Sequence, residues 1–459
     1  MFTKEPSSYK DKSGFVFWYH GEVFRCVSPA YKNHYEHFID SGLSEKLTSH
    51  SLIIAHHEVD DTSIFPIDPE DIYKVIKPKT LPFISYPYEW SYEQLKDAAL
   101  ATLKILRISL DHGMILKDAH PFNIQFVDNH PLLIDTLSFE KYTEGTPWVA
   151  YKQFCEAFIA PLAVLSQVDN RLNNILRTYT DGIPLDIVPS LLPLKSKLKI
   201  GLLLHLFWHA RFSSRRANGE KIHSTKVSMA SLQRIISSLE DTIRSLRPKL
   251  KKTLWNGYYE HDHVTSAYVE KKSNFLINAL TTCKINSLLD VGSNEGMFSL
   301  LASKHGVHTI AVDSDPNCVE KLFLIAKREE RKLLTPLIVN LVNPSPSFGW
   351  NYQTQINFWD RIKRVDCILS YALIHHLVLT NHISFSMIAE QFAHHCRYLI
   401  IEFVGKEDPQ AQELIQLRQT LFDEYNEDNF EREFKKYFSM IKKEPLVPLS
   451  RTLYLMESM

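Results

Sequence analysis

The sequence predicts an α/β protein whose carboxy-terminal half is built on a parallel sheet. From residue 286 onward, short apolar runs alternate with stretches of helical periodicity. The first run ends in a glycine turn, DVGSNEG at 290–296, and the second run ends on Asp313. Such alternation is typical of parallel strands joined by helices that cover both faces of the sheet. Ligands of these sheets bind at the carboxyl ends of the strands, where the turn and Asp313 are both expected.

The composition is that of a globular protein of two or three domains. The 459 residues are 44% hydrophobic and 23% charged, with a formal net charge of −1. A chain so close to neutrality has no overall positive field, so we expect no DNA binding. The longest apolar runs, at 157–165 and 201–208, are too short to span a bilayer. We expect buried helices there and no membrane insertion.

Cysteine usage and the first residues predict the compartment. The six cysteines are scattered and contain no CxxC pair. Structural zinc needs clustered ligands and disulfide frameworks suit small secreted chains, so we expect reduced thiols and no metal. The start, MFTKEPSSYKDKSG, lacks the apolar core of a secretory signal. A cytoplasmic protein is therefore predicted, with secretion by a route without a cleaved signal left open.

The amino-terminal half has a mixed α+β pattern. A β-hairpin is predicted at 14–27, turning at His20-Gly21. Other expected elements are helices at 29–48, 91–110 and most of 148–210, and strands at 51–59, 72–78 and on both sides of 128–130. Residues 213–228 are small, polar and basic, which indicates an exposed loop, and an amphipathic helix is expected at 229–247. The predicted parts are a first domain at 1–212, a connector at 213–252 and a second domain at 253–459.

The carboxy-terminal half supplies seven expected strands. Five are predicted at 286–291, 308–313, 336–342, 365–371 and 397–403. The last residues, 437–457, are expected to form a two-stranded hairpin.

The turn at 290–296 has the position of a nucleotide-binding loop but the wrong charge for a diphosphate. Its spacing is GxxxG rather than GxGxxG, and Asp290 and Glu295 would repel phosphate groups. S-adenosylmethionine (SAM) carries an α-amino group and a sulfonium and no phosphate, so it suits these carboxylates. Asp313 follows Asp290 by 23 residues, close to the distance at which an acid grips a ribose diol. We expect SAM here, with a ligand-free turn as the alternative.

Two motifs, LLDVGSNEGMF and IAVDSDP, resemble the first two motifs of class I SAM-dependent methyltransferases. The resemblance implies a Rossmann-like, seven-stranded domain at 253–459. In that family the acid after strand one and the glycine loop hold the methionine part, and the acid after strand two holds the ribose. This sequence has Asn294 where the family has its middle glycine, and Asn340 where an acid commonly faces the adenine. The implied cofactor-binding residues are Asp290, Gly292, Ser293, Asn294, Gly296, Asp313, Ser314, Asn340 and Ser370.

The resemblance has a narrower form that extends over nearly the whole chain. NPSPSFGW, SYALIHHL, IIEFVGKEDPQ and SRTLYLME resemble rhizobial nodulation-type methyltransferase proteins, as do HGMILKDAHPFNIQF and EGTPWVAYKQFC in the other half. It implies methyl transfer and leaves the acceptor open among a small molecule, a glycan, a protein and an RNA.

An oxygen or nitrogen acceptor can require a base. His375 and His376 follow the fourth strand and Glu402 lies in the fifth, which makes these three the candidate catalytic residues. Adjacent helical residues point about 100° apart, so at most one histidine faces the acceptor, and we expect His375. A core or capping histidine is the alternative. Asp408 is a further candidate, or else a solvated loop carboxylate, and Tyr258, Tyr259 and Tyr268 are expected to cover the cofactor.

A second candidate site lies in the amino-terminal half. Asp118, Asn123 and Asp135 have the order of a phosphotransfer loop, with an Asp near the acceptor hydroxyl and an Asn and a second Asp as metal ligands. His120-Pro121 resembles the loop of aminoglycoside-phosphotransferase-type kinases, which implies a kinase-like fold for 1–212. A glycine-rich phosphate loop is not evident in the first 30 residues, and only Arg25 stands near the position of the strand lysine.

We therefore predict a pseudokinase that presents substrate to, or regulates, the methyltransferase half. ATP-dependent phosphotransfer by the first half, which would make the protein bifunctional, and a non-catalytic SAM-binding scaffold stay as alternatives.

Overall fold

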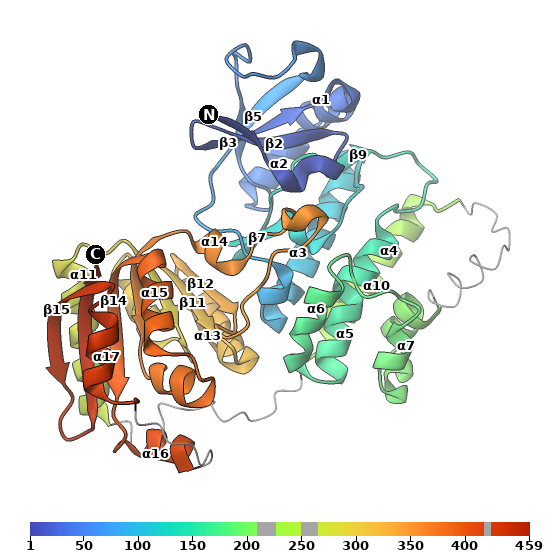
Figure 1. Cartoon of the computed structure of the whole chain (residues 1–459). Helices are drawn as coiled ribbons and strands as arrows, with labels where there is room; N and C mark the ends of the chain where they lie inside the picture. The colour runs from blue at the N-terminus through green and yellow to red at the C-terminus, as the bar shows by residue number, and fades with distance from the viewer. Residues whose placement is uncertain (209–225, 249–264, 417–423) are drawn as a thin grey trace. The chain divides into compact units, whose positions relative to one another are not determined.

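The computed structural model describes residues 1–208, 226–248, 265–416 and 424–459 (Figure 1). The chain divides into two compact units. Unit 1 comprises Met1–Lys251 and Ser347–Ile356, and unit 2 comprises Lys252–Pro346 and Asn357–Met459. Most of the basic loop expected at 213–228, and Tyr258 and Tyr259, lie outside the described residues. None of the helices in the described ranges has the length and apolar content needed to cross a bilayer.

Unit 1 begins with a five-stranded antiparallel sheet of order β1-β2-β3-β5-β4. Its strands are β1 (Phe2–Lys4), β2 (Gly14–Tyr19), β3 (Glu22–Val27), β4 (His56–Glu58) and β5 (Lys74–Pro78). The predicted hairpin is confirmed, because β2 pairs with β3 and the turn residues His20 and Gly21 have φ of 50° and 83°. The strand expected at 51–59 is wrong over most of its length, since only β4 forms there.

Helices, one short hairpin and a second two-stranded sheet make up the rest of unit 1. They are α1 (Lys32–Asp40), α2 (Leu43–Ser49), α3 (Tyr92–Asp111), α4 (Tyr151–Phe154), α5 (Ala160–Gln167), α6 (Ile175–Thr178), α7 (Val188–Leu191), α8 (Ile200–Leu202), α10 (Met229–Ser245), β6 (Met114–Leu116) with β9 (Phe139–Lys141), and β7 (Ile124–Val127) with β8 (His130–Leu133). The apolar run 157–165 is buried, as expected. The run 201–208 is only partly buried, because Leu204 and Trp208 are exposed, so that expectation is wrong in part.

Unit 2 is an α/β fold with a mixed sheet of order β12-β11-β10-β13-β14-β16-β15. Its elements are α11 (Ser266–Thr282), β10 (Ser287–Val291), α12 (Met297–Lys304), β11 (His308–Asp313), α13 (Pro316–Arg328), β12 (Leu334–Ile338), α14 (Phe358–Ile362), β13 (Val365–Ser370), α15 (Phe385–His395), β14 (Cys396–Val404), α16 (Pro409–Gln416), α17 (Glu427–Phe434), β15 (Phe438–Pro445) and β16 (Arg451–Ser458). The strands from β10 to β14 are parallel, and β16 runs antiparallel to both β14 and β15.

The order of the strands fixes where a ligand binds. The chain moves from β10 outward to β11 and β12, then returns to place β13 on the other side of β10. The crevice between β10 and β13 is therefore the switch point of the sheet, at which α/β proteins bind their ligands. Leu288, Cys367 and Leu369 pack under α11 and α12 on one face of the sheet. Helices α15 and α17 cover the other face (Figure 1).

Candidate active site

A cavity of about 260 Å³ opens at the carboxyl ends of β10, β11, β12 and β13. Most of the predicted cofactor-binding residues meet around it, although they come from three separate segments of the chain. Those that line it are Asp290, Gly292, Ser293, Asn294, Asp313, Ser314 and Asn340. Gly296 and Ser370 do not line the cavity, and Ser370 is fully buried behind it.

The glycine turn is shaped by backbone that favours glycine. Gly292 has a φ of 73°, and a Cβ atom at this position would lie 3.1 Å from Leu373 Cδ1. Its N–H and that of Ser293 both donate to Val312 O at the end of β11. Asn294 has a φ of 51°, a conformation that asparagine tolerates better than other side chains. The asparagine in place of the family's middle glycine therefore fits this turn.

Gly296 serves packing rather than the cavity. Its φ is 77°, and a Cβ atom there would lie 2.3 Å from Leu322 Cδ1. We expect Gly296→Ala to lower the free energy of unfolding by about 2–3 kcal/mol, because strain and a clash add together. Gly306→Ala is the matched control, since Gly306 has a φ of 83° and open space around it. Urea titration of both variants checks this, and equal losses would show that the contact with Leu322 does not matter.

Asp290 and Asp313 place two carboxylates beside the cavity. Ser299 Oγ donates to Asp290 Oδ2 over 2.5 Å. The N–H groups of Asn294 and Asp315 each donate to Asp313 over 2.8 Å. Burial raises the pKa of Asp290 to about 7 and that of Asp313 to about 6, and these hydrogen bonds oppose the shift only in part. A positively charged ligand in the cavity would stabilise the ionised form of both carboxylates.

The buried cation Lys272, on α11, was missed by sequence reasoning. Its Nζ lies 2.9 Å from Glu402 Oε2 and within 5.1 Å of the ring centroids of Tyr268, Phe298 and Tyr371. Lys272 also lines the cavity. The available signal was a lysine four residues after Tyr268 in an otherwise aromatic helix face, but its partner Glu402 is 130 residues away.

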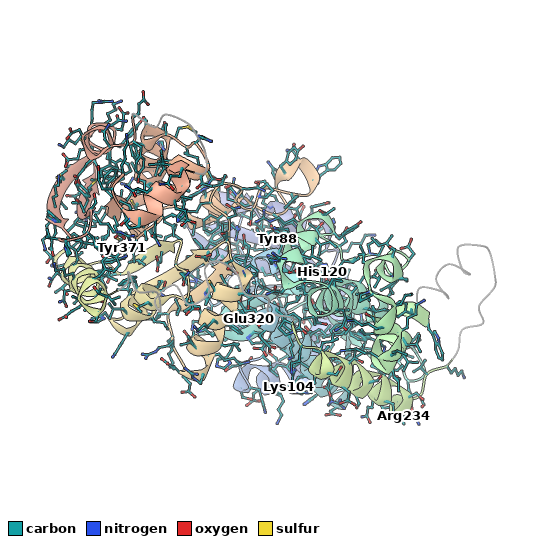
Figure 2. The ribbon with its side chains drawn as sticks, turned by 90° about the horizontal axis from the view of Figure 1, so that it is seen from below. Tyr88, Lys104, His120, Arg234, Glu320 and Tyr371 are labelled. Atoms are coloured by element: carbon teal, nitrogen blue, oxygen red, sulfur yellow. The ribbon has the colours of Figure 1, made fainter. Side chains whose placement is uncertain are left out.

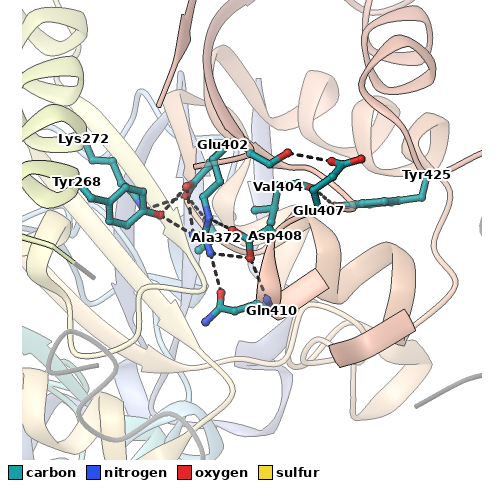
Figure 3. A network of polar contacts seen from close by, with 11 residues as sticks. Tyr268, Lys272, Ala372, Glu402, Val404, Glu407, Asp408, Gln410 and Tyr425 are labelled. Atoms are coloured by element: carbon teal, nitrogen blue, oxygen red, sulfur yellow. Dashed lines mark hydrogen bonds and ion pairs between the residues drawn. The ribbon is translucent and has the colours of Figure 1, made fainter. Parts of the chain in front are cut away.

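Glu402 is held inside a network of polar contacts (Figure 3). It accepts hydrogen bonds from Tyr268 Oη over 2.5 Å and from Ala372 N over 2.8 Å, and Arg451 lies 3.4 Å away. Burial alone would raise the pKa of Glu402, but the charges of Lys272 and Arg451 outweigh it and lower the pKa to about 2. A carboxylate so tightly paired is a poor base, and it does not line the cavity. The structure therefore favours a structural role for Glu402 over the predicted catalytic one.

Asp408 belongs to the same network rather than to a solvated loop. It is buried, and Arg451 Nε lies 2.7 Å from its Oδ2. Arg451 also donates to Gln410 and to Tyr268 Oη. The network therefore ties α11, β14, β16 and the start of α16 together beside the cavity.

The adjacent histidines have different environments. His375 is fully buried, does not line the cavity, and has neither ring nitrogen hydrogen-bonded within the described part of the chain. His376 lines the cavity. His376 begins a π-helical turn, His376–Thr380, and the structure places its ring, rather than the expected His375, at the cavity. Burial, assisted by the charge of Arg451, lowers the pKa of His376 to about 4, so its ring is neutral at pH 7.

Two hydroxyl groups at the cavity have no hydrogen-bond partner among the described residues, which bears on whether a polar cofactor fits. Ser293 Oγ and Thr380 Oγ1 are buried, and neither is hydrogen-bonded to any residue in the described ranges. Both residues line the cavity. Buried polar atoms are rarely left without partners, so these hydroxyls fit a ligand that supplies hydrogen-bonding groups.

The D–N–D residues of unit 1 are engaged by protein side chains. Asp118 Oδ1 accepts from Gln153 Nε2 over 2.8 Å. Asp135 Oδ1 lies 2.7 Å from Arg25, which also pairs with Asp11. Asn123 Nδ2 donates to Ser138 Oγ over 3.4 Å.

A histidine of the same loop is bonded to one of those carboxylates. The backbone N–H of His120 donates to Asp118 Oδ1 over 3.1 Å, and His120 lines a small cavity together with Tyr88 (Figure 2). Within the described ranges, no three His, Cys, Asp or Glu side chains are grouped as metal ligands. The guanidinium of Arg25, 2.7 Å from Asp135 Oδ1, offsets the charge of that carboxylate.

The fold and the glycine turn define the carboxy-terminal part as a class I SAM-dependent methyltransferase domain. Residues 237–437 match the family described as "Methyltransferase domain". S-adenosyl-L-methionine is accordingly its cofactor, as the charge of the turn predicted.

The similarity to nodulation-type proteins is also confirmed. Nodulation protein NoeA of Rhizobium meliloti (strain 1021) is 28% identical over 457 residues, which cover 98% of this chain and 95% of NoeA. Among solved structures, N-methyltransferase NodS from Bradyrhizobium japonicum WM9 is 9% identical, with 42% of this chain and 97% of NodS covered and a TM-score of 0.31. The bifunctional kinase-methyltransferase WbdD is 17% identical, with 47% and 45% covered and a TM-score of 0.32.

Proposed function

We propose that the protein is an active SAM-dependent methyltransferase whose acceptor atom is oxygen or nitrogen. The observation that carries the proposal is the buried carboxylate of Asp290 and the half-buried carboxylate of Asp313, which line one cavity together with the glycine turn. The cofactor would supply an electrophilic methyl group on a sulfonium. Asp290 and the backbone of Gly292 and Ser293 would hold its methionine part, Asp313 its ribose, and Asn340 its adenine edge.

The chain's own task is to orient the acceptor and keep water out. Orientation of two reactants can contribute about 7–11 kcal/mol to a rate, so a shaped, closed cavity is the main requirement. Tyr371, Leu373 and Leu377 form an apolar part of its wall. His376 stands in the same wall, and its neutral ring can accept a hydrogen bond from the O–H or N–H of the acceptor and so orient it.

We expect His376→Gln to lower the rate of methyl transfer by up to about 10²-fold through loss of acceptor orientation, while leaving SAM affinity within about a factor of three. Because the pKa of His376 is about 4, the wild-type rate should not fall between pH 8 and pH 6, where an ordinary histidine would titrate. Single-turnover assays with labelled SAM check both statements. His394→Gln, at an exposed histidine, is the control. A rate loss that appears only as weaker SAM binding would remove His376 from the proposed chemistry.

Two measurements test the proposed function. Calorimetric titration with SAM should show binding in the wild type and none in Asp290→Ala. Labelled SAM incubated with fractionated cell extract should then transfer label to protein, RNA, glycan or a small molecule, and should do so only with the wild type. Binding without transfer to any fraction would favour a non-catalytic scaffold.

We also propose that unit 1 is a kinase-like domain that serves the methyltransferase as a substrate platform or regulator. Its antiparallel sheet, the following helix α3 and the Asp118–Asn123–Asp135 order support this proposal. The ion pair between Arg25 and Asp135 argues against phosphotransfer, because it occupies the carboxylate that a metal ion would need. Mg-ATP titration tests it, since tight binding that is lost in Asp135→Asn would favour a bifunctional enzyme.

A further inference from the structure

An apolar and basic surface lies on unit 1, away from every residue discussed for either site. It consists of Leu194, Lys195, Lys197, Leu198 and Ile200, which we call the 194–200 surface. Its three apolar side chains are 79%, 84% and 73% exposed. Both lysines are exposed as well. Single exposed apolar residues are common, but three of this size within seven positions require an explanation.

The inner side of this segment is firmly anchored, so the exposed side chains do not fold inward. Ser196, Leu202 and Leu206 are buried. His205 is hydrogen-bonded to Tyr151 Oη over 2.7 Å and to Ser238 Oγ over 2.9 Å.

Close packing against α10 adds to this anchoring. A Cβ atom at Gly201 would lie 1.9 Å from Thr242 Oγ1, so the segment already touches that helix. The fold fixes one side of the segment and leaves the 194–200 surface facing outward.

The charges along the segment itself have one sign. Residues 187–208 contain Lys195, Lys197 and Lys199 and no aspartate or glutamate, although the whole chain has a net charge of −1. Lysine is depleted from the centre of protein–protein interfaces, whereas here it alternates with the exposed apolar residues. Apolar side chains interspersed with lysines are the pattern of segments that lie in the interface of an anionic bilayer. Lysine ammonium groups meet lipid phosphates there while leucine and isoleucine enter the acyl boundary.

We propose that the 194–200 surface binds an anionic lipid bilayer peripherally. This attachment would hold the protein at a membrane through the exposed side chains of that surface. The inference is independent of methyl transfer, because no residue of the surface lines the cofactor cavity.

Vesicle co-sedimentation of the full chain tests the proposal. Vesicles of phosphatidylcholine with 30% phosphatidylglycerol should bind the wild type at least tenfold more strongly than pure phosphatidylcholine vesicles, and 0.5 M NaCl should weaken this binding. Leu198→Ser/Ile200→Ser should reduce binding at least tenfold, and so should Lys195→Glu/Lys197→Glu. Circular dichroism and thermal unfolding show that each variant is folded.

The controls match each change elsewhere on the surface. Lys104→Glu/Lys332→Glu makes the same charge change at exposed lysines, one of them labelled in Figure 2. Met387→Ser removes an exposed apolar side chain of unit 2. Both should bind like the wild type. Absence of binding to anionic vesicles, or equal losses in the controls, would overturn the proposal. Self-association of the wild type that the Leu198→Ser/Ile200→Ser change abolishes, without vesicle binding, would make the surface a protein contact instead.

Discussion

Replacing Glu402 by alanine is expected to lower the free energy of unfolding by about 3–5 kcal/mol. The reason is that Lys272 would keep its buried ammonium group but lose the carboxylate 2.9 Å away. An unpaired charge in such a place costs far more than the pair itself contributes. Urea titration measures the loss, and Glu413→Ala, at an exposed carboxylate of α16, is the control.

The pH dependence of stability is a second test of the role of the Glu402 carboxylate. The pKa of Glu402 is lowered from 4.5 to about 2 in the folded protein. Its stabilising contribution is therefore present above pH 4.5 and is lost as the pH falls from 4.5 towards 2. The double change Lys272→Met/Glu402→Met should be less harmful than Glu402→Ala, because it removes both charges. A Glu402→Ala loss below about 1 kcal/mol would contradict the network in Figure 3.

Replacing Asp290 by asparagine is expected to weaken SAM binding about 100-fold and to stabilise the ligand-free protein. The first effect follows because the variant keeps the shape of the side chain but loses a buried negative charge next to a cationic ligand. The second follows because burial raises the pKa of Asp290 from 3.8 to about 7. This carboxyl favours the folded state below pH 4, and that contribution is lost as the pH rises from 4 to 7.

The neutral amide avoids this cost, so we expect a gain of roughly 1–3 kcal/mol at pH 8 and little gain at pH 4. Wild-type SAM affinity should also rise between pH 6 and pH 8, and the asparagine variant should lose most of that rise. Calorimetry and thermal unfolding at both pH values measure these effects, with Asp60→Asn as the exposed control. A variant that binds SAM weakly but is less stable at pH 8 would show that Asp290 is needed for folding rather than for charge.

The positions of the first strands of the sheet could be predicted because a short apolar run followed by a turn residue is a local sequence pattern. The apolar run before Gly292 and the one before Asp313 gave strands at the observed positions, β10 and β11. The cavity residues on those two strand ends followed, because parallel strands bring their carboxyl ends together. The third strand lies at Leu334–Ile338 rather than 336–342, since Asn340 belongs to the loop that follows.

The rest depends on contacts between distant residues. The sequence around His375 and His376 contains no sign of the π-helical turn that decides which ring reaches the cavity. The sequence around Glu402 shows a carboxylate at the end of a strand but not its ion-pair partners. These partners, Lys272 and Arg451, are 130 and 49 residues away in the sequence. Pairing at such separations is set by packing of the whole unit, and local periodicity carries no information on it.

One short segment determines how this gene can be divided for expression. Ser347–Ile356 follows the β12 loop in sequence, yet it is part of unit 1, where Phe348 contacts the ring of Tyr88 and Ile356 N–H donates to Tyr86 Oη. A fragment that starts at residue 252 would contain Ser347–Ile356, so a fragment 1–251 would lack the residues that contact Tyr86 and Tyr88. A truncated product ending at 251 would then expose fresh apolar surface and tend to precipitate, so co-expression of both pieces is the safer route to soluble halves.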